Sequence, residues 1–142
     1  MYCTEKQMTE RFGARMVAQL TSRDGSDRIN RKALDSAIAD ATAEINMHLA
    51  GRYALPLSTV PLPLTRIACI LARDILAVNS DINDERWRDQ AADARKMLHD
   101  ISTGRVSLGV DAAARPPVAS DGGVQMVSGG RIWGRDKSGG FM

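Results

Sequence analysis

The spacing of apolar residues between Asn30 and Gly51 is the feature that most constrains the fold of this chain. Apolar side chains recur there in steps of four, three, four and four, at Leu34, Ile38, Ala41, Ile45 and Leu49. This spacing places them on one face of an α-helix, whereas a strand would need a period of two. Asn30 is a favourable residue for capping the start of such a helix. Gly51 is expected to end it.

Three further segments predict helices. Thr4 to Gln7 has the pattern of a capping box and begins a first helix, which Gly13 interrupts before a second short turn. Another main helix starts near Pro63, and the last runs from Asp84 to Ser102. Aromatic residues make up only 4% of the chain, so the core must be built from aliphatic side chains. The sequence therefore predicts an all-α fold, a small bundle of about four main helices.

The predicted helix after Pro63 carries more apolar surface than one packed face requires. One stripe includes Leu64, Ile67 and Leu71, and a second includes Ile70 and Leu76. Such a helix is either central or covered by a partner on its far side. The connector before it, residues 52–63, is rich in proline and apolar, so it should lie against another surface. The candidate interface residues of the body are Ile67, Ile70, Leu71, Leu76, Tyr53 and Leu55.

The composition changes from Gly104 onward, where nine of the twelve glycines lie. We therefore divide the chain into a helical body, residues 1–104, and an extended Gly-rich C-terminal arm, residues 105–142. Two short apolar runs flank Gly129-Gly130, which predicts a β-hairpin. An isolated hairpin is marginal in water, so this one should form only on a partner surface in an assembly. The candidate interface residues of the arm are Val124, Met126, Val127, Ile132, Trp133 and Phe141. The alternative is a disordered tail without a role.

The net charge of +2 comes from the arm, because residues 1–103 hold equal numbers of basic and acidic side chains. Arg131, Arg135 and Lys137 are the residues expected to contact DNA, although a dedicated nucleic-acid surface would be more basic. Neither a signal peptide nor a membrane span is expected. The two cysteines form no recognisable disulfide framework, and Cys69 is interpreted as a small buried residue.

Residues that could carry catalysis are few. His48 and His99 are the only histidines, and neither belongs to a metal-binding or catalytic motif. Both are interpreted as residues at the edge of the core rather than as ligands. Phosphate-binding loops and the nucleophile elbow of hydrolases are also missing. We therefore predict no catalytic residues, no metal and no cofactor, and a chain that is not an enzyme.

Several segments, in order over about residues 1–110, resemble a Mu-like phage protein family first catalogued as a domain of unknown function. The N-terminal ones are Met1-Tyr2-Cys3-Thr4, Arg11-Phe12-Gly13, the loop from Leu20 to Gly25 and the helix from Ala37 to Ala41. The remaining ones are Leu49-Ala50-Gly51-Arg52-Tyr53-Ala54-Leu55-Pro56-Leu57, the run from Arg66 to Arg73, and Gly104-Arg105-Val106-Ser107-Leu108-Gly109.

The family is similar in role to the helical head–tail adaptors of tailed phages. The resemblance implies a structural connector that forms a twelve-fold ring beneath the portal. It implies contacts with the portal, with the next neck or tail-completion protein, and with genomic DNA that passes through the lumen without specific recognition. The expected location is the virion neck, and the host cytoplasm during assembly.

Two other functions remain open at this point. A small DNA-binding regulator would use Arg131, Arg135 and Lys137 together with Arg11 and Arg15, which have helical spacing. An enzyme or peptidase accessory of phage assembly would need a reactive cluster, and no such cluster is found in the sequence.

Overall fold

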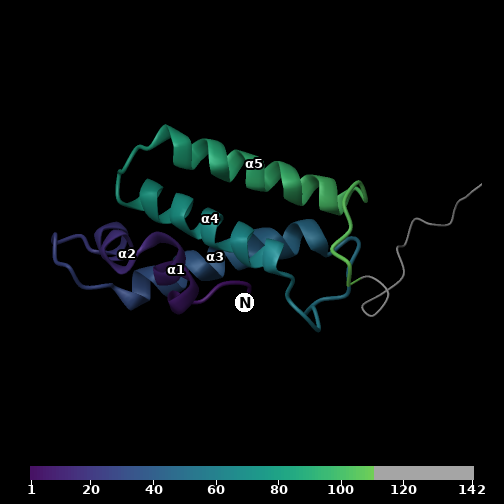
Figure 1. Cartoon of the computed structure of the whole chain (residues 1–142), viewed down its shortest axis with the longest axis horizontal. Coiled ribbons are helices and arrows are strands. Elements are labelled where there is room, and N and C mark those ends of the chain that lie inside the picture. Colours follow the sequence, from purple (N-terminus) through teal and green to yellow (C-terminus); the bar gives the residue numbers. More distant parts are fainter. Residues whose placement is uncertain (111–142) are drawn as a thin grey trace, which may run out of the picture.

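A computed structural model describes residues 1–110 of the chain, and residues 111–142 lie outside the described part. The described part contains five helices and no strand (Figure 1). They are α1 (Glu5–Phe12), α2 (Ala14–Thr21), α3 (Arg31–Leu49), α4 (Leu62–Asn79) and α5 (Glu85–Ser102). The prediction of an all-α fold is confirmed.

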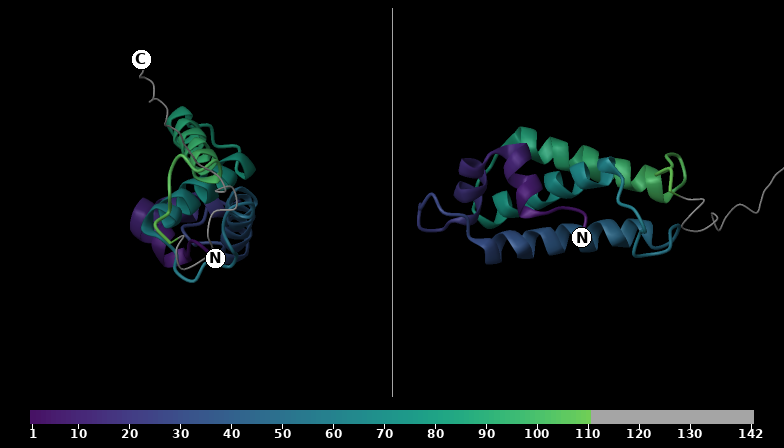
Figure 2. Two further views of the ribbon diagram at one scale, coloured as in Figure 1. Left: turned by 90° about the vertical axis from the view of Figure 1, so that its right-hand side faces the viewer. Right: turned by 60° about the horizontal axis from the view of Figure 1, so that its bottom comes forward.

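Helix α4 lies between α3 and α5, and the three long helices run alongside one another (Figures 1 and 2). Helices α1 and α2 pack against the bundle where α3 begins and α4 ends. The hydroxyl of Ser80, which follows α4, donates to the carbonyl oxygen of Leu20 in α2 at 2.6 Å. The opposite end of the bundle holds the connector between α3 and α4.

Hydrogen bonds confirm the predicted starts of α1 and α3, while α5 begins one residue after the predicted Asp84 and α4 one residue before Pro63. Thr4 and Gln7 form a complete capping box at α1. The side-chain oxygen of Asn30 accepts from the backbone N–H of Ala33 at 3.2 Å, which caps α3. The carboxylate of Asp84 accepts from the N–H groups of Arg86 and Trp87, which caps α5. Each cap satisfies backbone donors that have no partner inside the helix.

The helix ends follow the prediction less closely. Gly104 has a φ of 87° and ends α5 as expected, because the left-handed region suits glycine. Gly51 follows the C-cap residue Ala50, where the helix was predicted to end, but it does not have a positive φ, and the carbonyl of Leu49 accepts from the N–H groups of Arg52 and Tyr53. The predicted short turn after Gly13 is a full helix of eight residues, α2.

The core explains both apolar sides of α4. Ile67, Leu71 and Leu76 are at most 6% exposed, and Tyr53 of the connector is 2% exposed. Because α3 and α5 both pack on α4, the chain itself buries both apolar sides. The expectation that these four residues face a partner is therefore wrong for this fold. Ile70 and Leu55 remain half-buried.

Within residues 1–110, no helix has the length and apolar character needed to cross a membrane.

Candidate assembly surface

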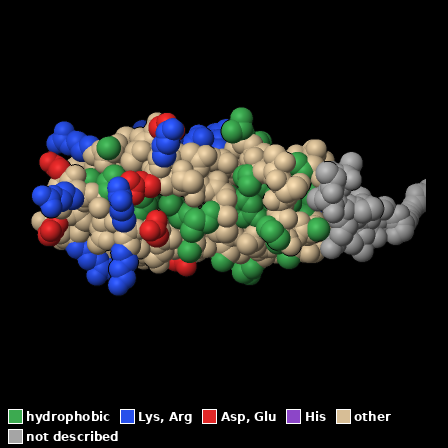
Figure 3. All heavy atoms as spheres, turned by 90° about the horizontal axis from the view of Figure 1, so that it is seen from below, with side chains coloured by type: hydrophobic (Ala, Val, Ile, Leu, Met, Phe, Trp, Pro, Cys, Tyr) green, Lys and Arg blue, Asp and Glu red, His purple; other side chains and the backbone are tan. Residues whose placement is uncertain are grey.

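Several exposed apolar side chains lie at the end of the bundle that holds the connector, although Val78 and Ile82 are exposed at the other end. Met47, near the end of α3, is 80% exposed, and Leu62, the first residue of α4, is 81% exposed. Between them, Val60 is also exposed, while Leu55 and Leu57 are half-buried. We call Met47, Leu55, Leu57, Val60 and Leu62 the connector patch. Figure 3 shows hydrophobic side chains concentrated on this half of the molecule.

Two of these residues are exposed because of their helix register. Met47 falls between Ile45 and Leu49, which both face the core, so its side chain points away from it. Leu62 precedes the first buried residue of α4, Leu64, by two positions and faces outward for the same reason. An apolar residue that falls outside the core stripe of its helix is therefore the sequence signal for this surface. The predicted interface residues did not include Met47 or Leu62.

The opposite end of the same face is charged (Figure 3). The loop between α2 and α3 lies there, and its Asp24 is fully engaged with its neighbours. The Ser22 hydroxyl and the Ser26 backbone N–H donate to its carboxylate, and they lower the pKa of Asp24 to about 2. In residues 1–110, no group of three or more His, Cys, Asp or Glu side chains could hold a metal ion.

Two side chains of the connector hold the segment that leads into the arm. The Arg52 Nη1 donates to the carbonyl oxygens of Ile101 at 3.0 Å and Val106 at 3.5 Å. The Tyr53 hydroxyl accepts from the backbone N–H of Leu108 at 3.3 Å. A Cβ at Gly104 would lie 3.1 Å from the Arg52 guanidinium, so glycine also leaves room for this contact. The chain consequently reaches the last described residue at the end that carries the connector patch (Figure 1).

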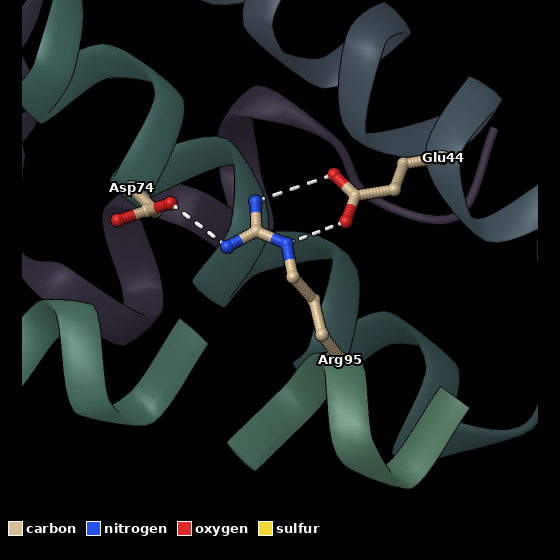
Figure 4. Close-up of polar contacts among 3 residues, drawn as sticks. All are labelled: Glu44, Asp74 and Arg95. Atoms are coloured by element: carbon tan, nitrogen blue, oxygen red, sulfur yellow. Dashed lines mark hydrogen bonds and ion pairs between the residues drawn. The ribbon is translucent and has the colours of Figure 1, made fainter. Parts of the chain in front are cut away.

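Arg95 joins the three long helices by ion pairs (Figure 4). From α5, its guanidinium contacts Glu44 of α3 through two nitrogens, at 2.6 and 3.3 Å, and Asp74 of α4 at 3.2 Å. These contacts, the hydrogen bond to Glu44 first, raise the pKa of Arg95. The three residues join α3, α4 and α5, because one guanidinium is shared by the two carboxylates.

Arg73 of α4 is a buried cation, 6% exposed, that sequence reasoning missed. Its guanidinium carbon lies 4.5 Å from the ring centre of Phe12 and 4.9 Å from that of Trp87, and Gln90 accepts a hydrogen bond from it. Burial lowers the pKa of Arg73, an effect that Asp84 and Asp74 oppose. Its helical position gave no indication of burial, because the aromatic partners come from α1 and α5.

The remaining predicted residues are placed as follows. His48 is half-buried and His99 is exposed, so only His48 lies at the edge of the core. Arg11 belongs to α1 and Arg15 to α2, and the break at Gly13 removes the continuous helix on which their spacing was interpreted. The interface and DNA-contact residues of the arm lie outside the described residues, as does the predicted hairpin: Val124, Met126, Val127, Arg131, Ile132, Trp133, Arg135, Lys137 and Phe141.

Comparison with known proteins identifies the family. Residues 2–127 match the family described as "Bacteriophage Mu, Gp36". The chain belongs to this Gp36 family. It is 30% identical to the "Mu-like prophage FluMu protein gp36" of Haemophilus influenzae over 142 residues, which covers 100% of this chain and 99% of that protein. It is 27% identical to "Gene product J" of Escherichia phage Mu over 139 residues, 97% of each chain.

Two segments that resemble this family, 49–57 and 104–109, contact each other in the fold. Arg52 and Tyr53 belong to the segment 49–57, and they bind the backbone of Val106 and Leu108 in the segment 104–109. In this Gp36-family chain, the motif residues therefore position the start of the arm relative to the connector patch.

Proposed function

We propose that this Gp36-family protein is a structural head–tail connector of a tailed phage. Copies of the chain would form a ring, twelve-fold by analogy with helical adaptors, beneath the portal. The ring would contact the portal on one side and the next neck or tail-completion protein on the other. Genomic DNA would pass through its lumen without specific recognition, and no step would involve catalysis. The protein would reside in the virion neck and, during assembly, in the host cytoplasm.

The connector patch is the observation that carries this proposal. Isolated apolar side chains are common on protein surfaces, but a contiguous apolar region marks a site of protein contact. Met47 and Leu62 come from different helices and flank the same connector, and each is about four-fifths exposed. A subunit of a closed ring needs two different surfaces, one for each neighbour. The connector patch supplies one of them.

The arm supports the second surface by its position. The described chain ends at Val110, on the same end of the bundle as the connector patch, and residues 111–142 follow. A segment of this length spans roughly 100 Å when fully extended, which is enough to reach an adjacent subunit or the portal. Trp133 is its best anchor, because tryptophan is enriched among residues that dominate binding energy.

The proposal can be tested by complementation of a phage that lacks the gene. A double substitution, Met47→Glu and Leu62→Glu, should leave folding intact, because exposed positions tolerate change to within about 0.5 kcal/mol. It should abolish infectious particles and leave DNA-filled heads without tails, visible by electron microscopy. The matched control is Val78→Glu, which changes an apolar residue, 69% exposed, at the opposite end of α4.

The control should restore infectivity. Full infectivity with the double variant would refute a role for the connector patch. Equal loss with both variants would show that the effect does not depend on this surface.

The DNA-binding alternative finds less support in the fold. Its argument from Arg11 and Arg15 required one helix, and these residues lie on two. The alternative then depends on Arg131, Arg135 and Lys137. A gel shift at low salt that shows no retardation of DNA would exclude it, because phosphate contacts strengthen as salt is lowered.

A further inference from the structure

Two cysteine side chains meet in the core, although 66 positions separate them in the sequence. Cys3 lies in the segment before α1 and is 1% exposed, and Cys69 lies in the middle of α4 and is 0% exposed. Their Sγ atoms are 2.8 Å apart, and both residues are free thiols. A disulfide bond has an S–S distance of roughly 2.05 Å, so only a small further approach separates this contact from a covalent bond.

Neighbouring contacts hold the Cys3 thiol against α4. The hydroxyl of Tyr2 donates to the side-chain oxygen of Asn46 on α3. On the other side, the capping box of Thr4 and Gln7 holds the start of α1. Because the residues before and after Cys3 are both fixed, the two sulfurs are brought together by the fold rather than by chance encounters of a loose terminus.

The surroundings favour a thiolate at Cys69. The hydrogen bond from Cys3 lowers the pKa of Cys69, burial opposes this, and the charge of Arg11 lowers it further. The same hydrogen bond, together with burial, raises the pKa of Cys3. The thiolate is the form of cysteine that attacks a disulfide. When residues 1–4 are lifted, the hydrogen bond from Cys3 is lost, but Arg11 of α1 still lowers the pKa of Cys69, so Cys69 is the sulfur suited to react first.

We propose that Cys3 and Cys69 form an intramolecular disulfide that fastens the N-terminal segment to α4 when the folded chain meets a disulfide oxidant such as oxidised glutathione. The Cys69 thiolate attacks one sulfur of the oxidant and forms a mixed disulfide, and one glutathione leaves with the proton that Cys69 has lost. The Cys3 sulfur then attacks Sγ of Cys69, and the second glutathione leaves with the Cys3 proton. Two protein thiols are oxidised and one glutathione disulfide is reduced to two thiols.

The burial of both sulfurs determines how this reaction proceeds. The oxidant reaches Cys69 only while residues 1–4 are lifted from the bundle, which is a local opening of the kind common at chain termini. Closure then places Cys3 against the mixed disulfide. The site is independent of the proposed function, because it needs only the folded chain and the oxidant. A reducing cytoplasm would keep Cys3 and Cys69 as free thiols, and an oxidising medium would form the disulfide between them.

The test uses the purified full-length protein, equilibrated in mixtures of reduced and oxidised glutathione, quenched in acid, and then labelled with maleimide in denaturant at neutral pH so that any free thiol is accessible. Oxidising mixtures should yield a monomer without maleimide adducts. Trypsin should release the peptide of residues 1–6 linked to the peptide of residues 67–73. Because the bond closes a long loop, the Tm should rise by about 10 °C or more, and dithiothreitol should reverse the rise.

The matched control is Cys3→Ala, which keeps Cys69 and should show no rise in Tm in any mixture. Three outcomes would overturn the proposal. One is a folded protein that still carries two maleimide adducts in oxidising mixtures. The second is a disulfide between two chains or a stable glutathione adduct in place of the linked peptides. The third is an equal rise in Tm for Cys3→Ala.

Discussion

Arg95 of α5 contacts a carboxylate on each of the other two long helices, Glu44 on α3 and Asp74 on α4. Its partner Asp74 has a side chain that is only 12% exposed, whereas the Arg95 side chain itself is 41% exposed. Removing one member of a buried pair leaves the other charge without compensation, and this cost exceeds what the pair contributes when intact. The partial exposure of Arg95 reduces that cost.

We therefore expect Arg95→Met to lower the free energy of unfolding by about 1–3 kcal/mol, measured by urea denaturation. Methionine retains most of the apolar stem, so the loss reports on the charge. Lys6→Met is the control, because Lys6 and Glu10 form a pair at 4.0 Å with side chains 82% and 63% exposed. It should change stability by less than about 0.5 kcal/mol. Equal effects of the two substitutions would contradict the structural role of Arg95.

Single residues were predictable from the sequence where their partners are close along the chain. Thr4, Asn30 and Asp84 cap helices through neighbours two or three positions away, so local chemistry was sufficient. Arg73 and Cys3 find their partners on distant elements. No local pattern reports a contact of that kind, and both residues were missed.

At the scale of elements, the segment after α5 shows how the body continues beyond the predicted boundary. Leu108 and Val110 are partly buried against the core, and the N–H of Leu108 bonds to Tyr53. Residues 105–110, assigned to the arm from their composition, therefore contact the bundle. The rise in glycine content correctly indicated the end of α5, but not that residues 105–110 still pack against the bundle.

Two truncations separate the contribution of residues 105–110 to stability from that of residues 111–142 to assembly. A chain that stops after Val110 should keep its helical circular dichroism and its urea midpoint but fail to join the neck. A chain that stops after Gly104 should lose about 1–2 kcal/mol of stability, because it lacks the apolar contacts and the hydrogen bond to Tyr53. Unfolding of the longer truncation would show that residues 111–142 belong to the core. Equal stability of the two would mean that residues 105–110 contribute nothing.

The helices themselves were predictable because their apolar periods are long and regular. All five residues of the stripe from Leu34 to Leu49 are at most 2% exposed. What the period could not decide is which element covers the second side of α4. The cover depends on how α3, α4 and α5 pack together. Because α3 and α5 both pack on α4, residues expected at an interface are core residues.

At the scale of the whole molecule, apolar and charged side chains separate towards opposite ends of one face (Figure 3). The apolar end also carries the connector and the last described residues of the chain. This polarity is the reason to expect a directional assembly, in which the connector end contacts protein and the loop between α2 and α3 remains in water. Gathering of exposed residues from different elements is a property of the folded chain, so the sequence alone could not predict it.

Cryo-electron microscopy of the neck in mature particles tests the central claim most directly. The account predicts a ring of copies of this chain beneath the portal, in which Met47 and Leu62 are buried against a neighbouring subunit or the portal. A neck without density for this chain would contradict the proposed connector function. A ring in which the connector patch faces solvent would contradict the surface assigned to it.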